Sequence, residues 1–288
     1  MIFVLLLVAV TAVWGWTFVL VKDAITQYPT LPFLQLRFLL AALLMILLVH
    51  RLPSRRELWV GVVAGTVLAG GYLSQTFGQT MTSPGNAGLI TGLFVVFTPL
   101  IDRLFGSPVH RRTAVAILLA LVGTLMLAGG PAGFGLGDLL VLGCAVLYAL
   151  HIVLLSKWSP GLRSAPLAMV QMATCAVIFS IGGTPTLLHT APPSPTVWFS
   201  ILITGVFASA IAFYIQTWAQ AHLDASRTAL ILATEPAWAL VSSVVLAGQR
   251  LDLLQGLGAV LVLAAIVGHE LAPLLGRGLQ KNRIGSSP

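Results

Sequence analysis

Apolar residues run along the chain in ten long stretches, which short polar or proline-containing turns separate. Most of these stretches reach the ~20 residues that an α-helix needs to cross the hydrocarbon core of a bilayer. The sequence therefore predicts ten transmembrane helices and leaves no room between them for a soluble domain. The predicted helices are residues 2–21, 31–50, 57–80, 84–105, 113–129, 136–156, 165–183, 195–219, 225–247 and 252–271.

Composition supports an all-α integral membrane protein. Of the 288 residues, 58% are hydrophobic and only 8% are charged, whereas a soluble domain carries about 25% charged residues. The first stretch lacks a basic segment before it, and Trp14 and Trp16 occupy positions where a signal peptide has small residues, so we expect a retained helix. Cys144 and Cys175 both lie inside apolar stretches and indicate neither a disulfide framework nor a metal site.

Basic residues are distributed unevenly between the two sides of the predicted helices. Cytoplasmic loops of membrane proteins are rich in Lys and Arg, and the predicted turns on the side of the N-terminus carry most of these residues. The opposite side has only Lys22 and Arg250, and Arg37 lies within the second stretch. We therefore expect both termini in the cytoplasm. The net charge of +7 is spread over several short loops, which does not indicate nucleic-acid binding.

The two halves of the chain contain related segments. Residues 75–79 (QTFGQ) recur as residues 216–220 (QTWAQ), and Pro99 corresponds to Pro236. Each half holds five predicted helices, so the second copy enters the membrane from the opposite side. Inverted repeats are typical of secondary transporters, which bind substrate between the repeats. We expect repeats at 1–130 and 131–272 around a central cavity, followed by a disordered cytoplasmic tail at 273–288.

Several motifs resemble a known family. They are the Trp14 to Lys22 pattern in the first helix, the turn TSPGNA at 82–87, and Thr234-Glu235-Pro236 in the ninth helix. In this order they resemble the EamA branch of the drug/metabolite transporter superfamily, and within it the YddG-type amino-acid exporters. The resemblance implies export of amino acids or related metabolites. The two halves differ at two of these positions. Gln171 occupies the position that corresponds to Arg37, and Pro99 follows Phe97-Thr98, whereas Pro236 follows the acidic residue Glu235.

Polar side chains within hydrocarbon are costly and usually face a cavity or a partner. The intramembrane polar and aromatic residues include Trp14, Tyr148, Gln216, Gln220 and Trp238. From the whole set we select those whose chemistry suits a small polar metabolite. The candidate substrate-binding residues are Arg37, Lys22, Trp16, Tyr72, Gln75, Gln79, Asn86, His151, Tyr214, Trp218 and Glu235.

Each candidate also has a structural interpretation. Intramembrane Gln and Asn often bond neighbouring helices, His151 fits a packing role, and Lys22 and Trp14 fit interface anchors. Glu235 fits a bond to a neighbouring helix as well as a proton-responsive switch. For Arg37 the functional interpretation is favoured, because it lies deeper and has no acidic residue one turn away.

The sequence contains no phosphate-binding loop and no metal-ligand cluster, so we expect no enzymatic activity and no cofactor. We predict a monomeric secondary transporter of the inner membrane that exports small polar metabolites, most of all amino acids, by alternating access. The alternatives are a multidrug or nucleotide-sugar-like carrier of the same superfamily, a channel, or a membrane scaffold. A channel would need a ring of like pore-lining groups, which two unequal halves do not provide.

Overall fold

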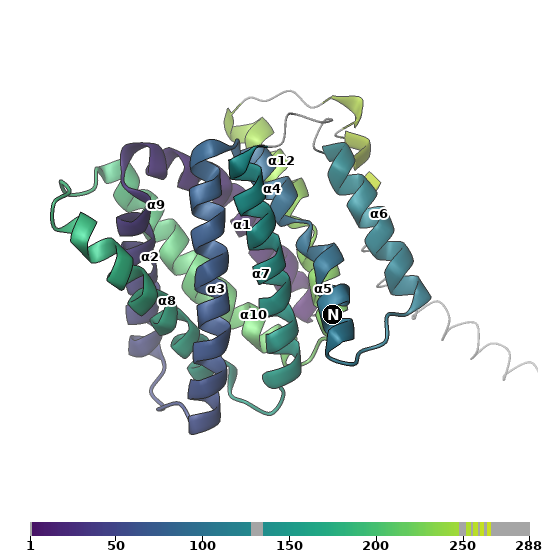
Figure 1. The fold of residues 1–288 in the computed structure, drawn as a ribbon, viewed down its shortest axis with the longest axis horizontal. Helices are drawn as coiled ribbons and strands as arrows, with labels where there is room; N and C mark the ends of the chain where they lie inside the picture. Colours follow the sequence, from purple (N-terminus) through teal and green to yellow (C-terminus); the bar gives the residue numbers. More distant parts are fainter. Residues whose placement is uncertain are drawn as a thin grey trace, which may run out of the picture.

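The computed structural model describes residues 2–127 and 135–247 and short pieces of 252–265. All regular secondary structure in these ranges is helical (Figure 1), which confirms the predicted all-α class. The elements are α1 (Ile2–Gln27), α2 (Thr30–Leu48), α3 (Arg55–Met81), α4 (Pro84–Thr91), α5 (Phe94–Leu104), α6 (Arg111–Leu127), α7 (Leu136–Trp158), α8 (Ser164–Leu187), α9 (Pro195–Gly205), the π-helix η1 (Val206–Ile211), α10 (Ala212–Gln220), α11 (Ala225–Leu232) and α12 (Glu235–Ala247).

The predicted stretches before residue 248 each coincide with one helix or with a run of consecutive helices. Seven segments of the described chain are long and apolar enough to cross a membrane. Three predicted helices are not continuous: α4 and α5 form the fourth, α9, η1 and α10 form the eighth, and α11 and α12 form the ninth. Half of the tenth predicted helix, 252–271, and the whole tail, 273–288, lie outside the described residues.

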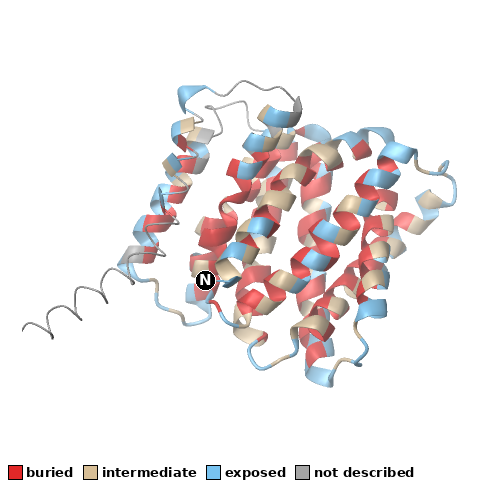
Figure 2. Cartoon of the chain, turned by 180° about the vertical axis from the view of Figure 1, so that it is seen from behind, coloured by how far each residue is buried: buried red, intermediate tan, exposed pale blue. Residues whose placement is uncertain are grey.

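The core forms mainly between the two halves of the chain. Helix α3 packs against α7 and α8, α2 packs against α8, and α1 packs against α12. Buried residues face the middle of the bundle, and exposed residues cover its outer faces (Figure 2). The outer faces include large apolar side chains such as Leu43, Val177 and Ile181, which are 56%, 61% and 76% exposed. Such side chains suit a lipid environment.

Small residues let α3 approach α8 closely. A Cβ atom on Gly65 would lie 2.8 Å from the Cβ of Thr174, and one on Gly61 would lie 2.6 Å from the Cβ of Val170. The backbone of α3 therefore lies almost directly against the side chains of α8. Close packing of this kind is common between membrane helices, because small residues allow extensive van der Waals contact.

The breaks in the fourth and ninth helices face each other. Helix α4 ends before Gly92, and a Cβ on Gly92 would lie 2.7 Å from the ring of Pro236, the second residue of α12. Pro236 has no N–H to donate to the carbonyl of Leu232, so the helix is interrupted there. The hydroxyl groups of Thr11 and Thr234 lie 2.7 Å apart and join α1 to this break. The interruption of both helices thus lies at one contact in the interior of the bundle.

Two ion pairs join the halves at the lower end of the bundle in Figure 1. The carboxylate of Glu57, at the start of α3, accepts hydrogen bonds from Nε and Nη2 of Arg163 at 2.9 and 2.6 Å. Nζ of Lys157, at the end of α7, lies 3.0 Å from the carboxylate of Asp102 in α5. In each pair the acidic residue belongs to the first half and the basic residue to the second.

Candidate functional site

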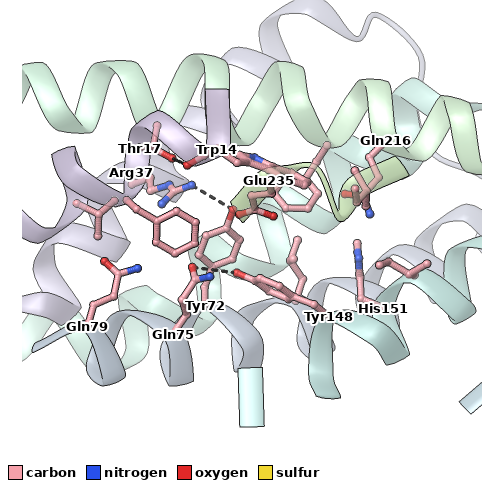
Figure 3. Close-up of a pocket in the computed structure, with 16 residues that line it drawn as sticks. Trp14, Thr17, Arg37, Tyr72, Gln75, Gln79, Tyr148, His151, Gln216 and Glu235 are labelled. Atoms are coloured by element: carbon pink, nitrogen blue, oxygen red, sulfur yellow. Dashed lines mark hydrogen bonds between the residues drawn. The ribbon is translucent and has the colours of Figure 1, made fainter. Parts of the chain in front are cut away.

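A central cavity lies between α1, α2, α3, α7, α10 and the junction of α11 with α12 (Figure 3). About 40 Å³ of the cavity is accessible to water, and roughly 10–15 Å³ of accessible volume holds one water. In this conformation it has room for a few waters. Its lining consists of Trp14, Thr17, Phe18, Val21, Arg37, Leu68, Tyr72, Gln75, Gln79, Tyr148, His151, Ile152, Phe213, Gln216, Leu232 and Glu235.

Arg37 supplies the positive charge of the cavity. It lies in the second turn of α2 and is 3% exposed. Its Nε donates to the hydroxyl of Ser209 at 2.9 Å, and its Nη2 donates to the hydroxyl of Tyr72 at 3.1 Å. The guanidinium carbon also lies 4.6 Å from the centre of the Tyr72 ring, within the range of a cation–π interaction. Neutral groups thus hold the guanidinium in place, and none of these partners neutralises its positive charge.

The partner of Arg37 on the eighth predicted helix belongs to the π-helix η1. Ser209 lies in η1, and the carbonyl of Ala208 accepts a hydrogen bond from Nε1 of Trp14 at 2.9 Å. A π-helix is rare and often occurs at functional sites. This segment therefore holds both Arg37 and Trp14 at the cavity wall.

Glu235 supplies the acidic side chain of the cavity. It is the first residue of α12, is 5% exposed, and points into the cavity (Figure 3). Among the described residues its carboxyl group has no hydrogen-bond or ion-pair partner, and it forms no ion pair with Arg37. The helix break at Pro236 determines where this side chain enters the cavity. A cationic and an acidic side chain therefore line one enclosed space without forming an ion pair with each other.

Helix α3 contributes a row of polar side chains. Tyr72, Gln75 and Gln79 all line the cavity, as expected for residues spaced along one helix face. Gln75 donates to Thr91 at 3.1 Å and accepts from the hydroxyl of Tyr148 at 3.4 Å. The Oε1 atom of Gln79 is buried and has no partner among the described residues.

Helices α7 and α10 contribute His151 and Gln216. Nε2 of His151 lies 2.8 Å from Oε1 of Gln171, and Gln171 itself does not line the cavity. Nε2 of Gln216 donates to Oε1 of Gln220 at 2.9 Å, and the Oε1 of Gln216 is a second buried acceptor without a partner in the described part of the chain.

Of the predicted site residues, Arg37, Tyr72, Gln75, Gln79, His151 and Glu235 therefore come together in this cavity. Lys22 does not line it: its Nζ donates to the backbone carbonyls of Gln79 and Thr82 at 2.5 and 3.1 Å, at the C-terminal end of α3. A cation stabilises the carbonyls at a helix C-terminus, so Lys22 ties α1 to α3.

The remaining predicted residues lie elsewhere. Trp16 is not part of the lining, although it is on the same helix as Trp14. Tyr214 and Trp218 line a separate groove at the lower end of α10, together with His50 and His222. Asn86 belongs to α4, but its side chain is outside the described part of the structure.

Trp14, Tyr148 and Gln216 line the cavity although they are not among the predicted substrate-binding residues, and the same holds for Thr17, Phe18 and Phe213. A pattern does identify part of this set. The lining residues of α1 are 14, 17, 18 and 21, which is the i, i+3, i+4, i+7 spacing of one helix face. Phe213 gives no such signal, because its neighbours in the eighth stretch, residues 210–212 and Ile215, are apolar as well.

The chain is similar along almost its entire length to known transport proteins. The EamA-like transporter family matches residues 1–129 and 135–269. An uncharacterized transporter of Archaeoglobus fulgidus is 31% identical, over 91% of this chain and 83% of the relative. The inner membrane transporter YedA of Escherichia coli K12 is 24% identical over 91% of this chain and 88% of its own. A probable amino-acid metabolite efflux pump of the same organism is 26% identical over 89% and 91%. A solved crystal structure shares the fold with a TM-score of 0.77 at 18% identity, over 94% of this chain and 98% of that one.

Proposed function

We propose, because this chain belongs to the EamA-like transporter family, that it is a secondary transporter that exports amino acids and similar small polar metabolites. The members of this family are transporters of the drug/metabolite type and not enzymes. Its membrane-spanning helices and its inner-membrane relatives make it a multi-pass protein of the inner membrane.

One observation carries the proposed substrate class: Arg37 and Glu235 line the same cavity and are not paired with each other. A central charge in a transmembrane helix costs about 2.5–3.5 kcal/mol on insertion scales, and such residues are usually functional. A guanidinium binds a carboxylate well, and a carboxylate binds an ammonium group. An α-amino acid carries both groups and would neutralise both residues. Arg37 is the only cationic lining residue among those described, which suits one carboxylate better than the diphosphate of a nucleotide sugar.

Alternating access is the mechanism that we propose. The two segments that match the family, 1–129 and 135–269, support two five-helix repeats of opposite orientation and a total of ten transmembrane helices. The lining draws on both repeats, as in other carriers with inverted repeats. Since the cavity holds only a few waters, we propose that the two repeats rock against each other to open it to one side at a time.

The distribution of charge supports a cytoplasmic N-terminus. The loops at residues 49–54, 105–110, 159–163 and 221–224 lie at the same end of the bundle as the N-terminus (Figure 1). These loops and the adjoining helix ends carry Arg51, Arg55, Arg56, Arg103, Arg111, Arg112, Lys157, Arg163 and Arg227. Following the positive-inside rule, we assign this end to the cytoplasm.

Counterflow in proteoliposomes tests the proposed function. Purified protein is reconstituted into vesicles loaded with a mixture of unlabelled amino acids, and the entry of a radiolabelled amino acid is followed. A carrier gives a transient accumulation of label that saturates with concentration. A channel gives flux without saturation or accumulation, and a scaffold gives no flux; either result refutes the proposal.

A further inference from the structure

We infer that the end of the cavity formed by His151 and Gln216 is a subsite for the side chain of the substrate, and that it selects uncharged side chains carrying a hydrogen-bond donor. This inference rests on the proposed function, because it assumes that the cavity binds an amino acid. It goes further in assigning a specificity to residues that touch neither the carboxylate nor the ammonium group.

The hydrogen bonds of Gln220 fix the amide orientation of Gln216. Nε2 of Gln220 donates to the carbonyl of Ile152 at 2.7 Å, and a carbonyl can only accept. Gln220 therefore presents Oε1 to its neighbour on the helix, and Gln216 donates to it through Nε2 at 2.9 Å. This leaves the Oε1 of Gln216, a cavity-lining residue that is 2% exposed, as a buried acceptor without a partner among the described residues.

A second chain of bonds fixes the tautomer of His151. Nε2 of Gln171 donates to the hydroxyl of Thr217 at 3.1 Å and approaches the carbonyl of Leu167 at 3.4 Å, so its Oε1 is the atom that meets His151. An amide oxygen can only accept, and therefore Nε2 of His151 carries the hydrogen in their 2.8 Å bond. In the neutral ring Nδ1 is then an acceptor, and it has no hydrogen-bond partner within the described chain.

Both acceptors belong to the same end of the cavity. Gln171 contacts Thr217, the residue after Gln216, and Figure 3 draws His151 and Gln216 at the end opposite Gln79. The rings of His151 and Phe213 are 5.9 Å apart and nearly perpendicular, so the acceptors stand beside an apolar wall. Such a subsite fits a small aliphatic body that bears an O–H or N–H group.

The two acceptors can be satisfied only by a donor from the substrate or by water. A substrate whose side chain has a methyl group in place of a hydroxyl would displace water and leave the acceptors unpaired. An unsatisfied buried acceptor weakens binding by roughly 5- to 150-fold. Sites built to bond a substrate hydroxyl discriminate strongly against the analogue that lacks it.

Competition between threonine and valine tests the subsite, because these amino acids have nearly the same shape and differ by a hydroxyl in place of a methyl group. Each is added as a competitor to counterflow of a labelled amino acid in proteoliposomes, with wild-type protein and with the Gln216→Met and His151→Phe variants. Gln35→Met is the matched control, since Gln35 is also buried with an unpaired Oε1 but lies outside the cavity. Thermal unfolding in detergent verifies that each variant is folded.

We expect threonine to compete at least fivefold better than valine in the wild type and in Gln35→Met, and the ratio to approach one in the two subsite variants. Equal competition in the wild type overturns the inference even if neither variant folds, while amino-acid counterflow itself still supports the proposed function. A preference that persists in both folded variants also overturns it. If the wild type transports no amino acid, the proposed function itself is refuted.

Discussion

Replacing Arg37 by glutamine removes the positive charge of the cavity and keeps a polar side chain of similar reach. In the proposed repeat, Arg37 corresponds to Gln171, which is fully buried in a helix of the same bundle. Helix α2 should therefore still insert. The amide can bond Ser209 or Tyr72, so at most one hydroxyl loses its donor, at a cost of about 1 kcal/mol in the free energy of unfolding.

The effect on substrate binding should be larger than the effect on stability. A hydrogen bond to a charged group contributes about 1.5–3 kcal/mol, and each 1.4 kcal/mol changes affinity about tenfold. If Arg37 binds the carboxylate of an amino acid, Arg37→Gln should weaken apparent affinity by about 10- to 150-fold. The apparent affinity of Arg37→Lys should lie between those of the wild type and Arg37→Gln, because lysine keeps the charge but not the fixed planar geometry of the guanidinium.

Competition assays compare an amino acid with the amine that lacks its carboxylate. In counterflow, the wild type should prefer the amino acid, and Arg37→Gln should lose most of this preference. Arg111→Gln, an exposed arginine at the start of α6, is the control and should behave as the wild type. A folded Arg37→Gln protein with wild-type affinity and an unchanged preference for the amino acid would refute the role of Arg37.

Three further predictions concern coupling, topology and packing. Glu235→Gln cannot ionise, so it should retain exchange of substrate for substrate but lose any stimulation of transport by an imposed pH gradient; proton coupling through this residue is excluded if the variant keeps that response or the wild type lacks it. A cysteine at Ser54 should be protected from an impermeant thiol reagent in intact cells and one at Thr190 should react, with little background because both native cysteines are buried; the reverse pattern would invert the assigned orientation. Gly15→Ala places a Cβ 2.5 Å from a backbone nitrogen of α12 and should destabilise the protein by about 1–3 kcal/mol, seen as a lower Tm in detergent, whereas Gly143→Ala, whose nearest neighbour would be 3.8 Å away, should leave the Tm unchanged.

The positions of the helices could be predicted because a membrane helix must be apolar over a fixed length, and this length is visible in the sequence. The row of Tyr72, Gln75 and Gln79 could be predicted for a similar reason, since helical spacing brings them to one face. Lys22 could not be distinguished from a site residue, because its acceptors are carbonyls of α3, and backbone groups leave no mark in a sequence.

Other features of the cavity wall could not be predicted either, because they too depend on backbone groups and on contacts with other helices. The π-helix η1 is defined by the pairing of its backbone hydrogen bonds, and the composition of Val206–Ile211 does not indicate this pairing. Phe213 lines the cavity through the rotation of α10, which only the packing of neighbouring helices determines. The different fates of Gln171, which bonds His151 outside the lining, and Gln216, which lines it, also follow from partners on other helices.

The two ion pairs across the halves have a consequence for biosynthesis. Glu57 and Asp102 precede their partners Arg163 and Lys157 in the sequence, so they are translated first. Until the partners have been made, each carboxylate must stay at the water interface or bind a temporary partner, and α3 has neither of the helices, α7 and α8, that cover it in the finished bundle. The first half therefore lacks its main packing partners until the second half has been made, and the two halves can pack together only late in synthesis.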